Sequence, residues 1–420
     1  MKVLFFCVLA VFVCMQYSCA KEFVTVKNQR LYIGNEQYHY IGSNYWYGVN
    51  LGAPDSGNRD RVKKELDQLK SMGVNNLRIM AGGQGPDDRE KRIVPSIEPA
   101  KNEFNEDVWL GFDFLLDEMA KRDMRAVVPI NNYWEWSGGF GQYVEWEGGD
   151  FNDPLSFYNM TEVQEHFRNF ISIMLNRTNT INGIKYLEDP TVMTWQLSNE
   201  PRIKNCTLYP IWIKDTTNYI KSLAPNHLVS IGNEGTITDC ADEGDTVKEV
   251  DYITFHLWIQ NWQWYDPMDP SSLVNGLKKA KEYLDENVEI GQHVKKPVVL
   301  EEFGIARDYN SYDPASTTLI RDFYYSFIFD YVIDHISEQK SNMVGTNFWS
   351  YGGFGRPSIN GGMWKPGDDF IGDPPHERQG WYSVYNNDTT IEVISNYTSR
   401  LSQVKTPTLV EQSHKILKES

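Results

Sequence analysis

The chain has 420 residues and a formal net charge of −17 at pH 7, without a long run of one sign. This balance disfavours nucleic acid and anionic membrane surfaces as partners, because both require a basic patch. Aromatic residues make up 14% of the chain, and 13 of them are tryptophans. Several of these tryptophans stand in polar, glycine-rich segments such as 131–139, which are not typical of a core.

The first 20 residues are typical of a secretory signal peptide. Lys2 gives a positive start, the apolar run 3–13 follows, and residues 18–20 are small enough for a cleavage site. The run is shorter than the roughly 20 apolar residues that cross a bilayer, although an uncleaved anchor is the alternative. No later stretch is long and apolar enough to be transmembrane. We therefore expect a secreted, extracellular protein whose mature part, 21–420, forms one domain.

Two cysteines, Cys206 and Cys240, remain after the predicted signal peptide. In an exported chain such a pair predicts one disulfide bond, and two free thiols are the alternative. Five Asn-x-Ser/Thr sequons also predict a glycoprotein with exposed segments. They lie at Asn159, Asn176, Asn205, Asn387 and Asn396.

Short apolar runs alternate with amphipathic stretches along the mature chain, which predicts parallel strands joined by helices. A small hairpin is expected first, at 23–33. Eight strands are then predicted at 38–44, 76–80, 125–131, 192–197, 228–232, 252–256, 297–301 and 345–349. Apolar residues at helical spacing predict helices between them, as at Val62, Leu66, Leu69 and Met72. Similar stripes lie within 108–119, 163–174 and 273–284.

This alternation fits a single (β/α)8 barrel, with the N-terminal hairpin capping its bottom. The alternative is an open, doubly wound sheet. That fold requires a glycine-rich phosphate loop after the first strand. The segment 45–48 reads Tyr-Trp-Tyr-Gly instead, so the sequence favours the barrel.

The active site of such a barrel lies at the C-terminal ends of its strands. The predicted ends carry carboxylates, one arginine, one histidine and many aromatic residues, without a Cys/His metal cluster or a serine elbow, and no cofactor is expected. Retaining cleavage of a glycosidic bond needs two carboxyl groups about 5–5.5 Å apart. Glu200 and Glu302 end strands that face each other across the barrel. The other candidates are Arg78, Asn131, Trp134, Trp136, Asn199, Glu234, His256, Trp258, Glu301 and Trp349.

Two of these strand ends resemble the signatures of glycoside hydrolase family 5, a family of clan A. They read Asn199-Glu200-Pro201 and Glu302-Phe303-Gly304, and the resemblance extends over most of the mature chain. Arg78, His256 and Trp349 also fall on family positions. Further segments are similar to endo-β-1,4-mannanases of the invertebrate type, at 44–46, 131–134, 138–139, 232–235 and 256–258.

The resemblance implies hydrolysis of internal β-1,4-mannosidic bonds by double displacement. It assigns Glu200 as acid/base and Glu302 as nucleophile, since Glu302 rather than Glu301 precedes Phe303-Gly304. Arg78 would keep Glu302 ionised, although a purely structural ion pair is the alternative. Predicted substrate contacts come from Arg78, Asn131, Trp134, Asn199, His256, Trp258 and Trp349.

Two positions leave alternatives open. Many family members carry tyrosine where this chain has Trp258, so a hydrogen bond to the nucleophile would depend on an indole N–H. Glu234 is as compatible with a structural role as with substrate contact. Asn199 is expected to bind the sugar 2-hydroxyl.

The expected substrate is a β-mannan polysaccharide, and the protein is expected to be a monomer. A β-1,4-glucanase or a transglycosylating relative is the first alternative, because mannose and glucose differ in one hydroxyl orientation. A few contacts worth about 1–3 kcal/mol decide between them. A non-catalytic secreted carbohydrate-binding protein is the second alternative, which the intact pair of glutamates disfavours.

Overall fold

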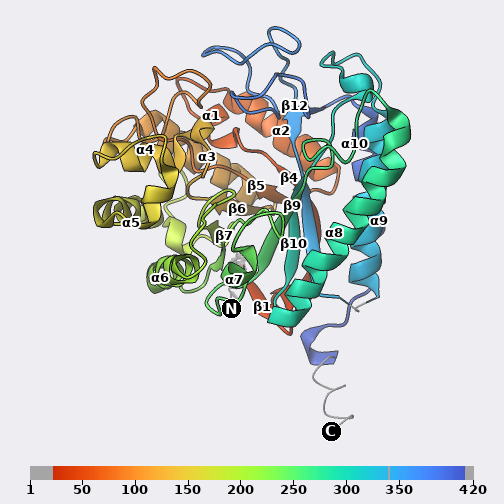
Figure 1. Ribbon diagram of the computed structural model, residues 1–420, viewed down its shortest axis with the longest axis horizontal. Helices are drawn as coiled ribbons and strands as arrows, with labels where there is room; N and C mark the ends of the chain where they lie inside the picture. The colour runs from red at the N-terminus through yellow and green to blue at the C-terminus, as the bar shows by residue number, and fades with distance from the viewer. Residues whose placement is uncertain (1–21, 339–340, 412–420) are drawn as a thin grey trace, which may run out of the picture.

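Eight parallel strands form a nearly closed barrel in the computed structural model, which describes residues 22–338 and 341–411 (Figure 1). The predicted signal peptide lies outside the described residues. The strands are β4 (Tyr40–Asn44), β5 (Asn76–Arg78), β6 (Arg125–Pro129), β7 (Val192–Gln196), β8 (Leu228–Ser230), β9 (Ile253–Leu257), β10 (Val298–Phe303) and β11 (Met343–Phe348). The predicted (β/α)8 barrel is thus confirmed, and each predicted strand overlaps an observed one.

The barrel closes between β8 and β9, the two outer strands of the sheet order. Backbone hydrogen bonds bridge this gap, from Asp251 N to Val229 O (2.9 Å) and from His256 N to Glu234 O (3.1 Å). The second bond lies at the C-terminal rim and ties two of the sequence candidates together. The closure therefore also fixes part of the site.

Helices cover the outside of the barrel (Figure 1). The long ones are α2 (Arg59–Ser71), α3 (Glu106–Lys121), α5 (Thr161–Asn176), α6 (Leu208–Leu223), α8 (Leu273–Val294), α9 (Leu319–Ser337) and α10 (Thr389–Ser402). Short helices are α1 (Gly48–Leu51), α4 (Gly139–Trp146) and α7 (Ala241–Asp245), with 3-10 turns at Glu135–Ser137, Pro154–Tyr158, Tyr186–Glu188, Pro270–Ser272 and Asp308–Asn310. In α2, the predicted stripe of Val62, Leu66 and Leu69 is fully buried. Within the described residues, no helix has the length and apolar character needed to cross a membrane.

The N-terminal segment forms a three-stranded antiparallel sheet, of β1 (Val24–Lys27), β2 (Arg30–Ile33) and β3 (Glu36–Tyr38). The predicted hairpin is its first two strands. The third strand differs from the prediction, because the run 38–44 divides at residue 39 between β3 and β4. Val24 and Leu31 pack in one apolar cluster with Val127 and Val299 of the barrel strands, so this sheet closes the barrel bottom.

A long segment, 354–383, crosses the opposite end of the barrel between β12 (Tyr351–Gly353) and β13 (Val384–Tyr385). Asp373 organises it by accepting hydrogen bonds from Tyr382 N (2.6 Å), Gly380 N (2.8 Å) and Ser383 Oγ (2.5 Å). Buried acceptors need such donors. The segment is thereby held with residues 374–379 over the barrel mouth.

Candidate active site

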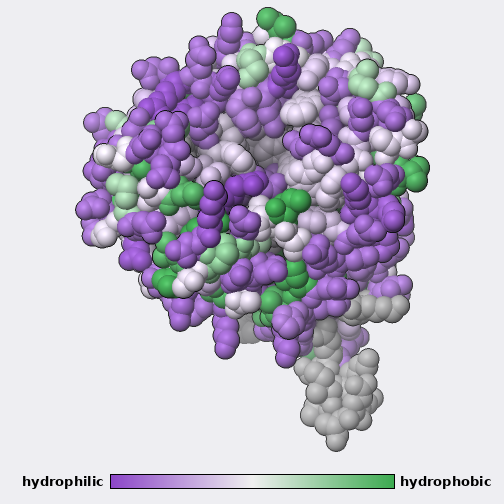
Figure 2. Space-filling model, in the orientation of Figure 1, coloured by the Kyte–Doolittle hydropathy of each residue, from purple (hydrophilic) through white to green (hydrophobic). Residues whose placement is uncertain are grey.

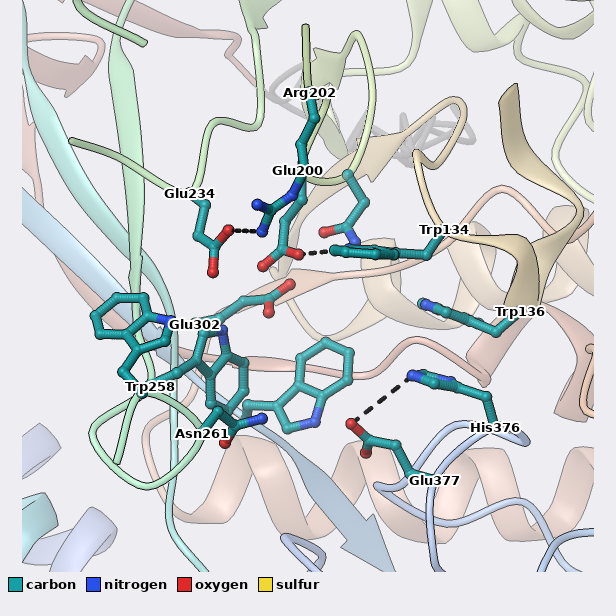
Figure 3. A pocket seen from close by; sticks show the side chains of 13 residues that line it. Trp134, Trp136, Glu200, Arg202, Glu234, Trp258, Asn261, Glu302, His376 and Glu377 are labelled. Carbon is teal, nitrogen blue, oxygen red and sulfur yellow. Dashed lines mark hydrogen bonds and ion pairs between the residues drawn. The ribbon is translucent and has the colours of Figure 1, made fainter. Parts of the chain in front are cut away.

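The C-terminal end of the barrel holds a pocket of about 300 Å³. The molecular face in Figure 2 is hollowed and mainly hydrophilic around the hollow. Figure 3 shows the carboxyl groups of Glu200 and Glu302 directed toward the same space. The lining residues are Trp134, Trp136, Asn199, Glu200, Arg202, Glu234, Trp258, Asn261, Trp262, Glu302, Trp349, His376 and Glu377. Most of the sequence candidates thus meet in one pocket.

Glu200 follows β7 with a positive φ of 46°. Non-glycine residues rarely adopt this conformation, and it persists only where surrounding contacts hold it. Here the Glu200 N–H donates to Gly232 O (2.9 Å). Its carboxylate accepts from Trp134 Nε1 (2.6 Å) and lies 2.6 Å from His256 Nδ1. Both ends of the residue are therefore fixed, and its side chain is directed into the pocket.

Glu302 lies near the end of β10, where Arg78 donates a hydrogen bond to its Oε1. Ligand atoms of Glu200, His256 and Glu302 lie within 4.8 Å of one another. This spacing matches the short distance between the carboxyl groups of retaining glycosidases rather than the longer inverting one. Among the described residues these three are also the ones close enough to share a metal ion.

Arg78 connects several strands beneath the pocket. It donates to Asn199 Oδ1 (2.6 Å), to Gln196 Oε1 (2.8 and 3.0 Å) and to Asn44 Oδ1 (3.2 Å), besides Glu302. A guanidinium group offers five N–H donors in a rigid plane, so it can hold these acceptors in fixed positions. The predicted partnership of Arg78 and Glu302 is present, within a larger network than the sequence indicated.

Glu301 occupies a different environment from its neighbour Glu302. Its Oε2 accepts from Gln196 Nε2 (2.7 Å) and lies 3.5 Å from Arg78 Nε, and the residue is fully buried. It does not line the pocket, whereas Glu302 does. The geometry therefore supports the choice of Glu302 over Glu301.

The electrostatics of the catalytic candidates are unequal. Burial raises the pKa of Glu302 well above its usual value, although Arg78 opposes this shift. Burial would also raise the pKa of Glu200, but the contact with His256 and the N–H of Trp134 outweigh it and lower that pKa. The two carboxyl groups lie so close that the charge of one alters the titration of the other.

Arg202 and Glu234 form an ion pair beside Glu200 (Figure 3). The Arg202 guanidinium lies over the Trp134 ring, 5.0 Å from its centroid. Burial and the charge of Glu200 raise the pKa of Glu234 to about 8, against the opposing Arg202. Arg202 follows Asn199-Glu200-Pro201 directly, and this adjacency is the signal that would have found it.

His376 and Glu377 line the pocket from the segment 354–383 and were not anticipated. The His376 ring stacks on Trp136, with centroids 5.8 Å apart and planes 9° apart. Burial raises the pKa of Glu377 well above its usual value. No periodic pattern marks this segment, so only its tertiary position reveals these residues.

The remaining predicted contacts are distributed unevenly. Trp258 and Trp349 line the pocket and pack edge to face, 5.9 Å apart. His256 lies behind Glu200 and is fully buried. Asn131 is not part of the pocket wall; it is buried, and its carbonyl and side-chain oxygens accept the N–H groups of Asn199 (2.8 Å) and Asn132 (2.8 Å). This position indicates a role in supporting Asn199, and the predicted substrate contacts of Asn131, Arg78 and His256, none of which lines the pocket, stay predictions.

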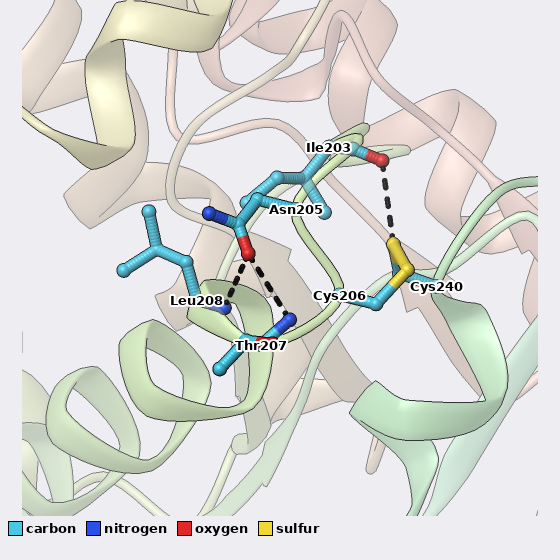
Figure 4. Close-up of a disulfide and its surroundings, with 6 residues drawn as sticks. All are labelled: Ile203, Asn205, Cys206, Thr207, Leu208 and Cys240. Carbon is cyan, nitrogen blue, oxygen red and sulfur yellow. Dashed lines mark hydrogen bonds between the residues drawn. A yellow bond between two sulfur atoms is a disulfide. The ribbon is translucent and has the colours of Figure 1, made fainter.

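A disulfide bond joins Cys206 and Cys240, as predicted (Figure 4). Cys206 lies in the loop after β7, four residues beyond Arg202, and Cys240 lies in the loop after β8, six residues beyond Glu234. The bond therefore links the two loops that carry the ion pair beside Glu200.

Comparisons with known proteins agree with this geometry. The family described as "GH family 5 beta-mannosidase-like" matches residues 21–406. "Mannan endo-1,4-beta-mannosidase 1" of Arabidopsis thaliana is 26% identical over 417 residues and covers 93% of both chains. "Mannan endo-1,4-beta-mannosidase 5" of Solanum lycopersicum is 28% identical over 350 residues, 78% of this chain and 80% of that one.

Solved structures show the same similarity. A glycoside hydrolase family 5 mannosidase from Rhizomucor miehei is 38% identical, with a TM-score of 0.85, and covers 91% of this chain and 98% of that chain. A variant of that mannosidase, solved in complex with mannosyl-fructose, matches with the same TM-score and identity.

Proposed function

Since this chain belongs to the glycoside hydrolase family 5 β-mannosidase-like family, we propose that it is a retaining endo-β-1,4-mannanase. Its substrates would be the internal bonds of mannan, glucomannan or galactomannan. The observation that carries the proposal is the pair Glu200 and Glu302, whose oxygens approach within 4.8 Å in an aromatic-lined pocket. The substrate class follows from the activities named for the relatives.

In the first step, Glu302 attacks the anomeric carbon and Glu200 gives its proton to the leaving oxygen. A covalent glycosyl-enzyme forms, and the first sugar product departs. Arg78 donates hydrogen bonds to both Glu302 and Asn199 and so fixes the position of the nucleophile for this attack. The developing positive charge at the anomeric carbon favours the ionised form of Glu302 and leaves the shared proton on Glu200.

In the second step, Glu200 removes a proton from water, and the water oxygen displaces Glu302 from the anomeric carbon. Each of the two displacements inverts this carbon, so the product retains the original configuration. Trp134 Nε1 and His256 Nδ1 stabilise Glu200 in the charged form that this step requires. These contacts, which oppose the first step, thus assist the second.

Two observations favour a second candidate, an exo-acting β-mannosidase. His376 and Glu377 lie across one side of the pocket, with His376 stacked on Trp136. A wall at this position would restrict binding to a chain end. The solved relative that is 38% identical is also named a mannosidase rather than a mannanase.

The product profile on linear β-1,4-mannan distinguishes these functions. An endo-enzyme releases a ladder of short oligosaccharides and lowers viscosity early, whereas an exo-enzyme releases mannose without early loss of viscosity. Proton NMR of the first product shows whether the anomeric configuration is retained. Parallel assays on glucomannan and carboxymethyl cellulose test the glucanase alternative.

Three variants assign the glutamates. Glu200→Gln and Glu302→Gln should each remove nearly all activity on mannan, because each carboxyl group has its own chemical role. Glu301→Gln is the matched control, since Glu301 is buried beside the nucleophile but outside the pocket. Full activity of Glu302→Gln together with loss in Glu301→Gln would overturn the assignment.

We also propose that the chain is exported as a monomeric glycoprotein, on the signal-like first 20 residues and the five sequons. Expression in eukaryotic cells tests export. The medium should contain a protein that lacks these residues and shifts in mass after glycosidase treatment. Retention of the full-length chain inside the cells would contradict the proposal.

A further inference from the structure

A second pocket, of about 370 Å³, opens on the surface beside the catalytic one. It lies between the loops after β8 and β9 and one face of α8. We call it the Trp264 pocket. Its lining residues are Thr236, Ile237, Trp264, Lys279, Glu282, Tyr283 and Glu286.

Two chain segments connect the Trp264 pocket with the catalytic pocket. In the loop after β8, Glu234 lines the catalytic pocket and Thr236 lines the second one. In the loop after β9, Trp262 and Trp264 do the same, with ring centroids 4.9 Å apart. Tyr283 fastens both loops, because its ring packs on Trp262 at 5.2 Å and its hydroxyl donates to Glu234 O (2.6 Å).

The chemistry of the Trp264 pocket suits a neutral, hydroxyl-rich ligand. Trp264 is half-buried, and Ile237 is 45% exposed, so apolar surface is available at the pocket wall. Exposed polar groups surround it: Lys279, whose ammonium lies 5.8 Å from the Trp264 ring centroid, and the carboxylates of Glu282 and Glu286. A few polar groups around an aromatic wall are typical of small-ligand sites. Two carboxylates against one ammonium disfavour an anionic ligand.

The position relative to Glu200 indicates which part of a substrate would reach this pocket. In the proposed reaction Glu200 protonates the leaving oxygen, and the ion pair of Arg202 and Glu234 lies beside Glu200. We therefore take their side of the pocket as the leaving-group side. Figure 3 shows these two residues on the side of the pocket away from His376 and Glu377. The path over Trp262 to Trp264 continues on the Glu234 side.

We infer that the Trp264 pocket is a remote subsite, which binds a neutral sugar unit of the substrate chain on the leaving-group side of the scissile bond. This inference rests on the proposed function. A remote subsite adds binding energy only for substrates long enough to reach it. The wild type should therefore cut long oligosaccharides more efficiently than short ones, and this advantage should depend on Trp264.

The test compares kcat/KM on manno-oligosaccharides of two to six units. Trp264→Ala should lower the value for the longest substrate by about tenfold and leave the value for the shortest nearly unchanged. Lys279→Ala, on the exposed face of α8, should lower the long-substrate value by about threefold without a risk to folding. Phe323→Ala, which removes another exposed aromatic ring, and Lys281→Ala, whose ammonium group pairs with Asp285 outside the pocket, are the matched controls.

The outcomes separate the inference from the proposed function. An unchanged ratio of long- to short-substrate efficiency in Trp264→Ala and Lys279→Ala would overturn the remote subsite while the hydrolase assignment stands. Equal losses on short and long substrates would do the same, because they indicate disturbance of the catalytic pocket. A wild type that cuts none of the oligosaccharides would overturn the proposed function and the subsite with it.

Discussion

Glu200 accepts hydrogen bonds that stabilise its charged form, although the proposed reaction begins with its protonated form. In the free site burial and the charge of Glu200 raise the pKa of Glu302, so the shared proton rests on Glu302. Arg78 favours its transfer to Glu200 when substrate is bound, because it pairs with Glu302 and stabilises the charged form of that residue. The division of roles between the two side chains thus depends on the substrate as well as on their partners.

Trp134→Phe tests how the hydrogen bond from Trp134 to Glu200 affects the pKa of Glu200. The substitution keeps an aromatic ring but removes the N–H that donates to Glu200 Oε2. Loss of a donor to the charged form raises a carboxyl pKa, so the alkaline limb of the kcat/KM profile should move up, by about half to one pH unit. The pH profile on a soluble mannan measures this. If the alkaline limb of the profile stays at the same pH, or moves to lower pH, the Trp134 N–H does not control the pKa of Glu200.

Glu234→Gln tests how the charge of Glu234 affects the protonation of Glu200. Burial and the charge of Glu200 raise the pKa of Glu234 to about 8, so its ion pair with Arg202 reaches full charge only at alkaline pH. There it neutralises Arg202 and repels a charge on Glu200, and both effects keep Glu200 protonated. The variant should therefore match the activity of the wild type near pH 6. Its alkaline limb should lie at lower pH than that of the wild type. A rise in KM with an unmoved alkaline limb would instead indicate that Glu234 only binds sugar.

Individual residues differed in how far the sequence predicted them. Glu200, Glu302 and Arg78 stand at strand ends, where the barrel itself places them. Asn131 also stands at a strand end, yet its side chain turns to a backbone N–H, and sequence spacing does not encode that rotation. Glu377 depends on the path of a non-periodic segment over the barrel mouth.

At the scale of elements, the loops after β6, β7, β8 and β9 and the segment 354–383 form most of the site at one end of the barrel. The loops after β7, β8 and β9 supply Glu200, Glu234 and Trp262, and the segment 354–383 supplies the opposite wall. Apolar runs predicted the strands that carry these loops, because buried parallel strands are nearly continuous in apolar residues. Loop paths depend instead on side-chain contacts within the loop, such as those of Asp373, which no periodic pattern marks.

The disulfide bond is the covalent link between two of these loops. Cys206→Ser combined with Cys240→Ser opens a loop with a sequence separation of 34 residues, and chain entropy then predicts a loss of about 3–4 kcal/mol in the free energy of unfolding. The Arg202–Glu234 pair should also loosen, which raises KM more than it lowers kcat. Thermal denaturation and steady-state kinetics measure both effects. Equal melting temperatures of variant and wild type under oxidising conditions would contradict the prediction.

For the whole molecule, the acidic groups at the surface differ from those in the interior. The surface is acidic overall, with a net charge of −17, which suits solubility and a neutral polymer substrate. Inside, several carboxyl groups are buried with raised pKa values, mainly because burial disfavours their charged form. They are Glu234, Asp245, Glu301, Glu302, Asp373 and Glu377.

These buried groups predict that stability falls as pH rises from about 4.5 to 8. A carboxyl group whose pKa is raised by folding holds a proton in the native state that the unfolded chain has already released. Its contribution to the free energy of unfolding is therefore lost as pH rises through this range. Each such group contributes at most about 1.4 kcal/mol per pH unit. Carboxyl groups with lowered pKa values, such as Asp113, lose their contribution as pH falls below about 4. Burial lowers the pKa values of His227, His256 and His376 to about 4, which opposes the trend up to about pH 6.5. The melting temperature should therefore fall most steeply between about pH 6.5 and 8.

Asp245→Asn isolates one buried group within this trend. Burial raises the pKa of Asp245 to about 7, and an amide imitates its protonated form. Its hydrogen bond from Asn233 Nδ2 (3.1 Å) survives, because an amide oxygen also accepts. The variant should match the wild-type melting temperature near pH 5 and decline less steeply toward pH 8. Glu243→Gln, at an exposed position of the same helix, is the control and should follow the wild-type slope. Equal slopes in all three proteins would locate the pH dependence at the acidic surface instead of in the buried carboxyl groups.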